Sequence, residues 1–136
     1  MADVVVSSNS ERSIAALAVY ELHRSVGWWS ERTEGDYAEV LRGGPAVGAW
    51  DAGDLVGFAR AITDGRLHAY VDDVMVRPDW RRRGVAARVV DALCQELSEI
   101  RVVSLFASGE LVKLSERCSF EPTRQIVLHR RRPPTR

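Results

Sequence analysis

"RPDWRRRGVAARVV" (residues 77–90) joins a valine-rich segment to an amphipathic one. The preceding residues 71–76, VDDVMV, have the composition of a β-strand. In the residues that follow, Val85, Val89 and Leu93 recur at the spacing of a helix that buries one face. The stretch therefore predicts a strand, a loop with three arginines and one glycine, and a helix that begins at the loop.

A helix that begins at such a loop is suited to bind phosphate. Its first amides have no partner inside the helix, and the helix dipole places about half a positive charge there. Gly84 lets the backbone approach a ligand, and Ala86 adds little bulk. Taken alone, Arg81–Arg83 are most simply a solvated loop. A nucleic-acid patch is disfavoured, because 19 basic residues balance 19 acidic ones and no aromatic residue interleaves the triplet.

Length and composition predict one globular domain. The 136 residues are 46% hydrophobic and 28% charged, so we expect a domain at 1–129 and a flexible basic tail at 130–136. No apolar run approaches the roughly 20 residues that span a bilayer, and the first residues lack the pattern of a secretory signal. We therefore expect a cytoplasmic protein. Cys94 and Cys118 lack metal-ligand spacing, so we expect thiols without a metal.

The whole chain predicts a mixed α/β domain, a central mixed sheet flanked by about four helices. The expected order is β-α-α-β-β-β-α-β-α-β. Ser10 is expected to cap the first helix, and Gly43 and Gly44 to end the second. The expected strands are residues 4–6, 45–50, 55–63, 67–76, 100–107 and 125–129, and the last helix is expected at 109–118.

The segment around Gly84 resembles a known coenzyme signature. Val76-x-Pro78, Trp80, Arg81-x-x-Gly84-x-Ala86 and an amphipathic helix follow one another as in the GNAT superfamily of N-acetyltransferases, whose acetyl-CoA motif is Gln/Arg-x-x-Gly-x-Gly/Ala. The expected strand order also matches that fold, and SERCSF at 115–120 stands where the family has a segment like YEKLGF. The resemblance covers 46–122 well and the first helices loosely. It implies a GNAT fold, acyltransferase activity and acetyl-CoA as the ligand of the loop.

The resemblance also implies coenzyme-binding residues. In this family the central strand separates from its neighbour at a bulge, and the pantetheine arm lies in the gap. The Val74 amide would then donate to the thioester carbonyl, where negative charge grows as an amine attacks. The implied coenzyme-binding residues are Val74, Met75, Val76, Arg81, Arg82, Arg83, Gly84, Val85, Ala86, Ala87 and Ser108.

The general base is expected among two carboxylates. Asp72 and Asp73 lie in a strand that is otherwise apolar, where charges are costly unless solvated, paired or functional. Because neighbouring strand residues point to opposite faces, we expect only one of them to face the cleft. Asp73 is preferred, since many relatives carry a carboxylate near that position. The alternative is that one pairs with an arginine while the other meets solvent.

The general acid is the point where the sequence departs from the family. Many members carry a tyrosine seven residues after an asparagine, and Ser115 and Ser108 stand at these positions here. A serine hydroxyl is a much weaker acid than a phenol. Either the coenzyme thiolate leaves without help, or Tyr70 or Cys118 donates the proton, or the protein binds acetyl-CoA without efficient turnover.

The acceptor is expected to bind near the first two helices. Trp28 and Trp29 lie between them, in the region that walls the acceptor pocket in this family, and form either a wall for an amine or ordinary core. The expected function is direct acetyl transfer from acetyl-CoA to a primary amine of a small molecule or a protein. The alternatives are a catalytically weak acyl-CoA-binding or sensing module and a basic-loop interaction protein without cofactor. We expect no nucleic-acid or membrane partner, and a homodimer paired through terminal strands is an option. The three histidines, His23, His68 and His129, are expected at surface or strand positions.

Overall fold

The computed structural model describes residues 3–27, 31–106, 113 and 118–133. Its elements follow the predicted order as far as the fifth strand. They are β1 (Val5–Ser8), α1 (Ala16–Ser25), α2 (Glu34–Gly43), β2 (Ala46–Asp51), β3 (Asp54–Thr63), β4 (His68–Val76), the short 3-10 helix η1 (Pro78–Trp80), α3 (Val85–Glu96) and β5 (Val102–Leu105).

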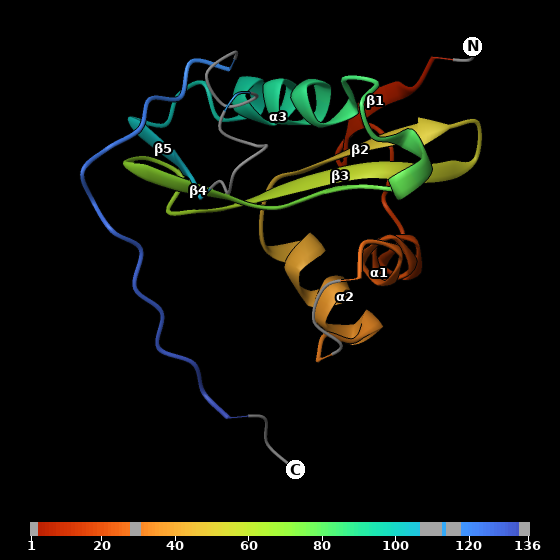
Figure 1. The fold of residues 1–136 in the computed structure, drawn as a ribbon, viewed down its shortest axis with the longest axis horizontal. Coiled ribbons are helices and arrows are strands. Elements are labelled where there is room, and N and C mark those ends of the chain that lie inside the picture. Colours follow the sequence, from red (N-terminus) through yellow and green to blue (C-terminus); the bar gives the residue numbers. More distant parts are fainter. Residues whose placement is uncertain (1–2, 28–30, 107–112, 114–117, 134–136) are drawn as a thin grey trace.

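The five strands form one mixed sheet in the order β1-β2-β3-β4-β5. The first four strands are antiparallel neighbours, whereas β5 runs parallel to β4. A parallel pair needs a crossover connection, and α3 provides it. Figure 1 shows α3 on one face of the sheet and α1 with α2 on the other. The predicted α/β class is confirmed.

Each face of the sheet has its own apolar core. On one face Val85, Val89 and Leu93 of α3 pack in a cluster with residues of all four antiparallel strands or their ends. On the other face Val19 and Leu22 of α1 and Tyr37 of α2 pack with Phe58 and Met75. The central strands are therefore covered on both sides.

Helix α3 lies very close to β3 because Gly57 has no side chain. A Cβ atom at Gly57 would stand 2.7 Å from Cγ1 of Val85 and 3.2 Å from Cβ of Ala49. Val85 is the first residue of α3, so this contact sets where the helix begins above the sheet.

The predicted cap of the first helix was wrong. Ser10 lies in a turn in which the amides of Glu11 and Arg12 donate to the Ser8 carbonyl, and its hydroxyl bonds to that of Ser8. Helix α1 begins only at Ala16, with Ala15 at the cap position and no side-chain cap bond. The predicted end of α2 at Gly43 and Gly44 is confirmed.

The predicted strand at 125–129 was also wrong. These residues are not in a strand, and Ile126 and Leu128 are 82% and 88% exposed. Figure 1 shows this part of the chain running away from the sheet. Branched apolar residues favour a strand only where a neighbouring strand accepts their hydrogen bonds and covers their side chains. The predicted helix at 109–118 falls almost wholly outside the described residues. The described residues hold three α-helices, fewer than the four expected.

Candidate active site

The β4–α3 junction has the predicted strand, loop and helix. Strand β4 ends at Val76, η1 covers Pro78–Trp80, and α3 begins after Gly84. Trp80 is buried below the loop, and the Arg83 guanidinium lies 4.6 Å from the centre of its ring. Arg77 and Asp79 form an ion pair with distances of 2.7 and 3.0 Å. These contacts fix the path of the loop.

The first turn of α3 offers main-chain N–H groups. Its first helical bond runs from the Arg88 amide to the Gly84 carbonyl, at 3.2 Å, so the preceding amides have no acceptor in the helix. No side chain caps this start, and no acidic residue lies in its first turn. By contrast, Thr33 and Asp36 form a complete capping box at the start of α2.

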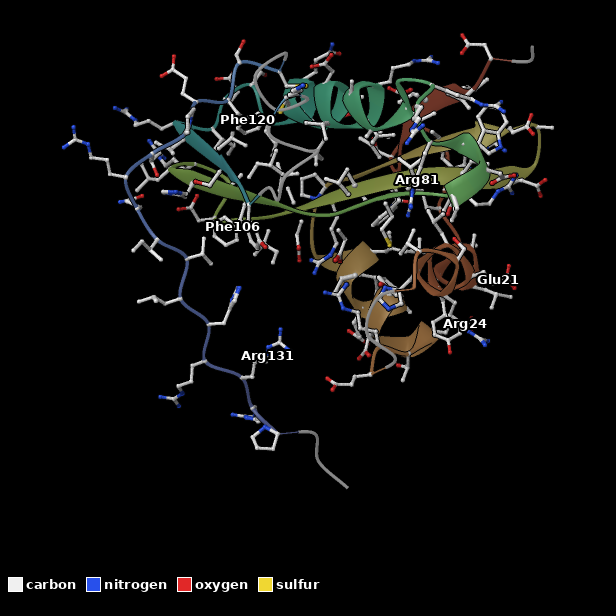
Figure 2. The ribbon with its side chains drawn as sticks, viewed as in Figure 1. Glu21, Arg24, Arg81, Phe106, Phe120 and Arg131 are labelled. Carbon is white, nitrogen blue, oxygen red and sulfur yellow. The ribbon has the colours of Figure 1, made fainter. Side chains whose placement is uncertain are left out.

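The space above Gly84 is open. Gly84 has a φ of +78°, and a Cβ atom there would meet nothing within 4 Å. Arg82 is also left-handed, with a φ of +65°, so the loop turns twice before the helix. The Arg81–Arg83 side chains are exposed, and Figure 2 shows Arg81 beside the sheet on the side of α1. Phosphate oxygens can accept from the amides of Gly84, Val85 and Ala86 while arginines add charge.

Beyond Val71, β4 has an edge that β5 does not pair. The β4–β5 ladder runs from His68 with Val102 to Val71 with Leu105, whereas β4 continues to Val76. The Arg77 amide donates to the Val56 carbonyl of β3 at 2.8 Å. Because main-chain N–H groups alternate in direction along a strand, the Val76 amide faces the opposite edge, which no strand among the described residues pairs there.

Asp72 and Asp73 share one arginine, which corrects the expectation that only one faces the cleft. Arg60 of β3 donates from Nε to Asp73 at 2.7 Å and from Nη2 to Asp72 at 3.1 Å. The reason is a bulge, since Phe58 pairs with Met75 but Arg60 pairs with Asp72. Two residues of β4 therefore oppose one of β3, and Asp73 has a φ of +54°. Both carboxylates then lie on the side of α1 and α2.

Asp73 is also bound from the α1–α2 connection. Arg32 contacts its second oxygen at 2.6 Å, and the Asp73 side chain is only 2% exposed. Although burial by itself lowers the pKa of Arg32, its hydrogen bonds to Asp73 and Tyr37 raise this pKa overall. The guanidinium therefore stays charged.

The polar network extends into the helical layer. Arg32 donates to the Tyr37 hydroxyl at 3.2 Å, and that hydroxyl bonds to Nδ1 of His23 at 2.8 Å. Burial raises the pKa of Tyr37. His23 is buried in α1, so its predicted surface or strand position was wrong. Its spacing of four residues from buried Val19 could have revealed this. Nothing in the sequence indicated the roles of Arg32 and Arg60.

Tyr70 borders the two carboxylates at the place where β4 and β5 separate. Its hydroxyl donates to Asp72 at 3.2 Å, and its ring centre lies 4.5 Å from that of Phe106. Figure 2 shows Phe106 at the end of β5. Burial and the neighbouring Asp72 charge raise the pKa of Tyr70 to about 12. Tyr70 is therefore a weaker acid than a free phenol.

Several predicted site residues cannot be placed. Trp28, Trp29, Ser108 and Ser115 lie outside the described residues. Among the residues that are described, no group of three or more His, Cys, Asp or Glu side chains could hold a metal ion. The helices within the same part of the chain include none that is long and apolar enough to cross a membrane.

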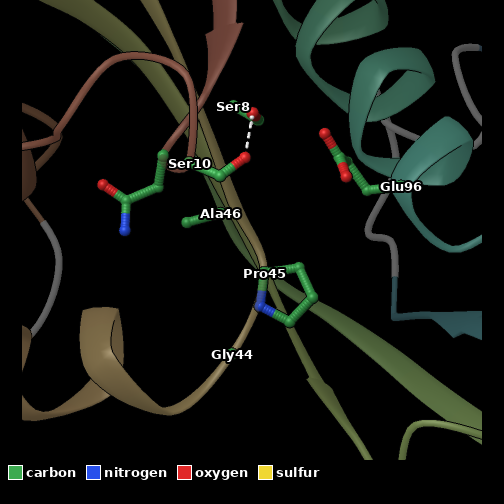
Figure 3. Close-up of a pocket in the computed structure, with 7 residues that line it drawn as sticks. Ser8, Ser10, Gly44, Pro45, Ala46 and Glu96 are labelled. Carbon is green, nitrogen blue, oxygen red and sulfur yellow. Dashed lines mark hydrogen bonds between the residues drawn. The ribbon is translucent and has the colours of Figure 1, made fainter.

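One cavity lies far from this junction. It has a volume of about 280 Å³ and is lined by Ser8, Asn9, Ser10, Gly44, Pro45, Ala46 and Glu96 (Figure 3). Glu96 is the last residue of α3, whereas Gly84 precedes its first. A helix of this length separates the two ends by about 17 Å, so the cavity is distinct from the turn at Gly84.

Comparisons with known proteins identify the family of this chain. The family model described as "Acetyltransferase (GNAT) family" matches residues 12–118. The uncharacterized N-acetyltransferase ycf52 of Pyropia yezoensis is 29% identical over 124 residues, which cover 87% of this chain and 70% of that protein. The ycf52 protein of Porphyra purpurea is 34% identical over 68 residues, which are 48% of this chain and 39% of that protein.

Solved structures share the fold over nearly the whole chain. A Xanthomonas campestris protein described as belonging to the GNAT family is 28% identical, with a TM-score of 0.76 and coverage of 98% of this chain and 96% of that one. The aminoglycoside N-acetyltransferase AAC(6')-Iy, solved in complex with CoA, has a TM-score of 0.69 at 19% identity, with coverage of 97% and 98%. The latter likeness shows the fold alone.

Proposed function

Because the chain belongs to the acetyltransferase (GNAT) family, we propose that it transfers an acetyl group from acetyl-CoA directly to a primary amine. That it is an N-acetyltransferase follows from the family, while the direct transfer and the amine acceptor are the proposal. The observation that carries it is the uncapped start of α3, where Gly84 leaves open space above free amides. Acetyl-CoA supplies an acyl group that is activated as a thioester.

The coenzyme phosphates would lie over the turn that opens α3. Gly84, Val85, Ala86 and Ala87 would donate main-chain N–H groups, and the Arg81–Arg83 side chains would add charge at the rim. Since Arg83 stacks on Trp80, Arg81 and Arg82 are better placed to move toward a ligand. Ser108 is a further candidate contact that the structure does not describe.

The thioester would lie along the unpaired edge of β4. Alternation along the strand, taken from the Arg77 bond to β3, supports Val76 and Val74 as the residues whose amides face this edge, and Met75 as one that faces β3. The Val74 amide is the proposed donor to the thioester carbonyl. A donor fixed before the reaction stabilises the charge that develops there.

Asp72 is the better placed of the two candidate bases. Its side chain is 22% exposed and makes one ion pair, whereas that of Asp73 is 2% exposed and makes two. A base must reach the amine proton directly or through one water molecule. The assignment of Asp73 as base stays a prediction, and its two guanidinium partners favour Asp72 for that role.

The acceptor would bind between β4 and the α1–α2 layer. The Asp72 carboxylate and the Tyr70 and Phe106 rings border this space, which suits a protonated amine before it loses its proton. One relative is named histone acetyltransferase TAP1, and the fold is shared with an aminoglycoside N-acetyltransferase. Both small-molecule and protein amines are therefore candidates, with Trp28 and Trp29 as proposed wall residues.

An acyl-CoA-binding module with weak turnover is the second candidate. One observation favours it. Ser115 stands where many relatives carry a tyrosine acid, and burial raises the pKa of Tyr70, the phenol bonded to Asp72, to about 12. Such a module would bind acetyl-CoA at the same turn without rapid release of the thiol.

Coenzyme binding is tested by a matched pair of glycine variants. Gly84→Glu should abolish acetyl-CoA binding in calorimetry, because its carboxylate would stand where the phosphates are proposed to lie. Gly65→Glu is the control, since Gly65 has a φ of +80° and equally open space but lies in the β3–β4 turn. The strain of the two variants is therefore similar, about 1–2 kcal/mol each. Equal affinity in the two variants would contradict the placement.

Turnover is tested by the appearance of free thiol from acetyl-CoA with a panel of amines. We expect thiol release that depends on the amine and is lost in Gly84→Glu. Binding of acetyl-CoA without such release, across small-molecule amines and lysine peptides, would favour the binding module instead. No binding in thermal shift or calorimetry would remove both candidates.

A further inference from the structure

Asp73 has a backbone conformation that its neighbours must maintain. Its φ of +54° lies in the left-handed region, where side chains other than glycine are disfavoured, although Asp and Asn tolerate it best. This residue and Val74 are the two residues of β4 that oppose Ala59 of β3. The bulge therefore depends on a strained aspartate.

Two arginines from different elements hold this aspartate, one at each carboxylate oxygen. Arg60, from β3, binds one carboxylate oxygen at 2.7 Å, and Arg32, two residues before α2, binds the other at 2.6 Å. Arg32 is itself bonded to Tyr37 of α2. We call Arg32, Arg60 and Asp73 the arginine clamp. It joins β3, β4 and the start of α2 at the bulge.

The bulge exchanges the two faces of β4. Before it, Ala69 and Val71 pack in the core on the α3 side. After it, Met75 packs in the core on the α1–α2 side, while Val74 and Val76 pack toward α3. A regular strand would reverse this arrangement from residue 73 onward, because side chains alternate strictly. It would turn Asp73 into the apolar core and redirect the amides of residues 74–76.

We propose that Asp73 is a positioning residue, whose carboxylate in the arginine clamp fixes the β4 bulge and so aims the edge of residues 74–76 at the coenzyme. This inference rests on the proposed function for its effect on turnover. It assigns to Asp73 a role that differs from proton transfer, and Asp72 is left to act as the base.

Three substitutions at Asp73 separate the two roles. All three substitutions remove the carboxylate. Glycine adopts the left-handed conformation freely and asparagine tolerates it, whereas alanine is strained there. We expect the glycine and asparagine variants to keep turnover within about tenfold of the wild type, and the alanine variant to lose on the order of a hundredfold, the effect of one misplaced donor. A residue acting as base would lose turnover equally in all three.

The pH profile gives a second distinction. In Asp73→Asn the acidic limb of kcat/KM should stay where it is in the wild type, because the base is elsewhere. In Asp72→Asn that limb should be lost. Ala52→Gly is the control for placing glycine at a left-handed residue, since Ala52 has a φ of +52° in the β2–β3 turn, and it should leave turnover unchanged.

A measurement without ligand tests the bulge itself. The Arg77 amide donates to Val56 only when the register beyond the bulge is kept. Its hydrogen exchange should be about tenfold faster in Asp73→Ala than in Asp73→Gly, the cost of a left-handed alanine. Arg32→Gln should speed the exchange in the wild-type background and have no effect in the Asp73→Gly background.

These readouts keep the two proposals apart. If the wild type binds no acetyl-CoA, the proposed function fails, and the exchange experiment alone decides the role of Asp73. Equal loss of turnover in the three Asp73 variants, or Arg77 exchange that is the same in all of them, would overturn the positioning role.

Discussion

Tyr70 illustrates how a single side chain changes its chemistry in the fold. Its phenol is partly buried and donates to Asp72, and burial followed by the Asp72 charge raises its pKa to about 12. The neutral phenol is thus favoured in the folded state relative to the unfolded state, in which the pKa is about 10. This argues against Tyr70 as the acid that protonates the coenzyme thiolate.

The raised pKa predicts how stability depends on pH. The stabilisation from the Tyr70 proton is fully present below about pH 10 and is lost as the pH rises toward 12, because the unfolded phenol ionises first. In urea titrations the free energy of unfolding of the wild type should therefore fall over this range relative to that of Tyr70→Phe. Asp72→Asn should narrow the difference. A gap between wild type and Tyr70→Phe that is the same from pH 8 to about 12 would contradict the prediction.

At the scale of elements, the position of α3 depends on a glycine of β3. Gly57 allows Val85, at the start of the helix, to approach the strand, and a Cβ atom there would stand 2.7 Å from the valine side chain. The same helix start carries the proposed phosphate-binding amides. Packing between the two elements and coenzyme binding are therefore linked.

Substitution of this glycine should affect both properties. Gly57→Ala should destabilise the fold by about 1–3 kcal/mol through overpacking, and it should weaken acetyl-CoA binding by shifting the first turn of α3. Gly53→Ala is the control, since a Cβ atom there meets nothing within 4 Å. Urea unfolding and calorimetry would measure the two effects. Equal behaviour of the two variants would show that the close approach does not position the helix.

At the scale of the whole molecule, two cores share one sheet. Phe58 belongs to the core on the α1–α2 side and Leu93 to the core on the α3 side, and both are fully buried. Since β3 and β4 contribute to both cores, neither core is complete without the sheet. We expect a single cooperative unfolding transition.

Two core variants test this cooperativity. Phe58→Ala should cost about 3–5 kcal/mol and Leu93→Ala about 2–5 kcal/mol, while Leu67→Ala, at a side chain that is 55% exposed, should cost less than about 0.5 kcal/mol. Tryptophan fluorescence and far-UV circular dichroism should report the same midpoint for each variant. Separate midpoints in Leu93→Ala would mean that α3 unfolds independently.

The predicted homodimer also belongs to this scale. Residues 124–133 are exposed and do not pair with the sheet, so the predicted pairing of terminal strands stays a prediction. So does the cytoplasmic location. Dimer formation and cellular location depend on contacts with other molecules, and local sequence patterns do not describe those contacts.

The sequence alone determined the class, the element order through β5 and the strand, loop and helix around Gly84. These features follow from the periodicity of apolar residues and from the ability of Gly84 to adopt a left-handed conformation. Both depend only on residues that are close together in the sequence. The strand predicted at 125–129 was wrong for the same reason. Its residues favour a strand, but a strand also needs a partner strand from elsewhere in the chain.

Only the tertiary structure decided how the two carboxylates are used. Local alternation separates Asp72 from Asp73, but the bulge brings both to Arg60. Arg60 meets Asp73 where β3 pairs with β4, and Arg32 joins them only when the helical layer closes on the sheet. A buried charge needs a partner that the fold brings to it. No pattern of adjacent residues shows which distant residue that partner is.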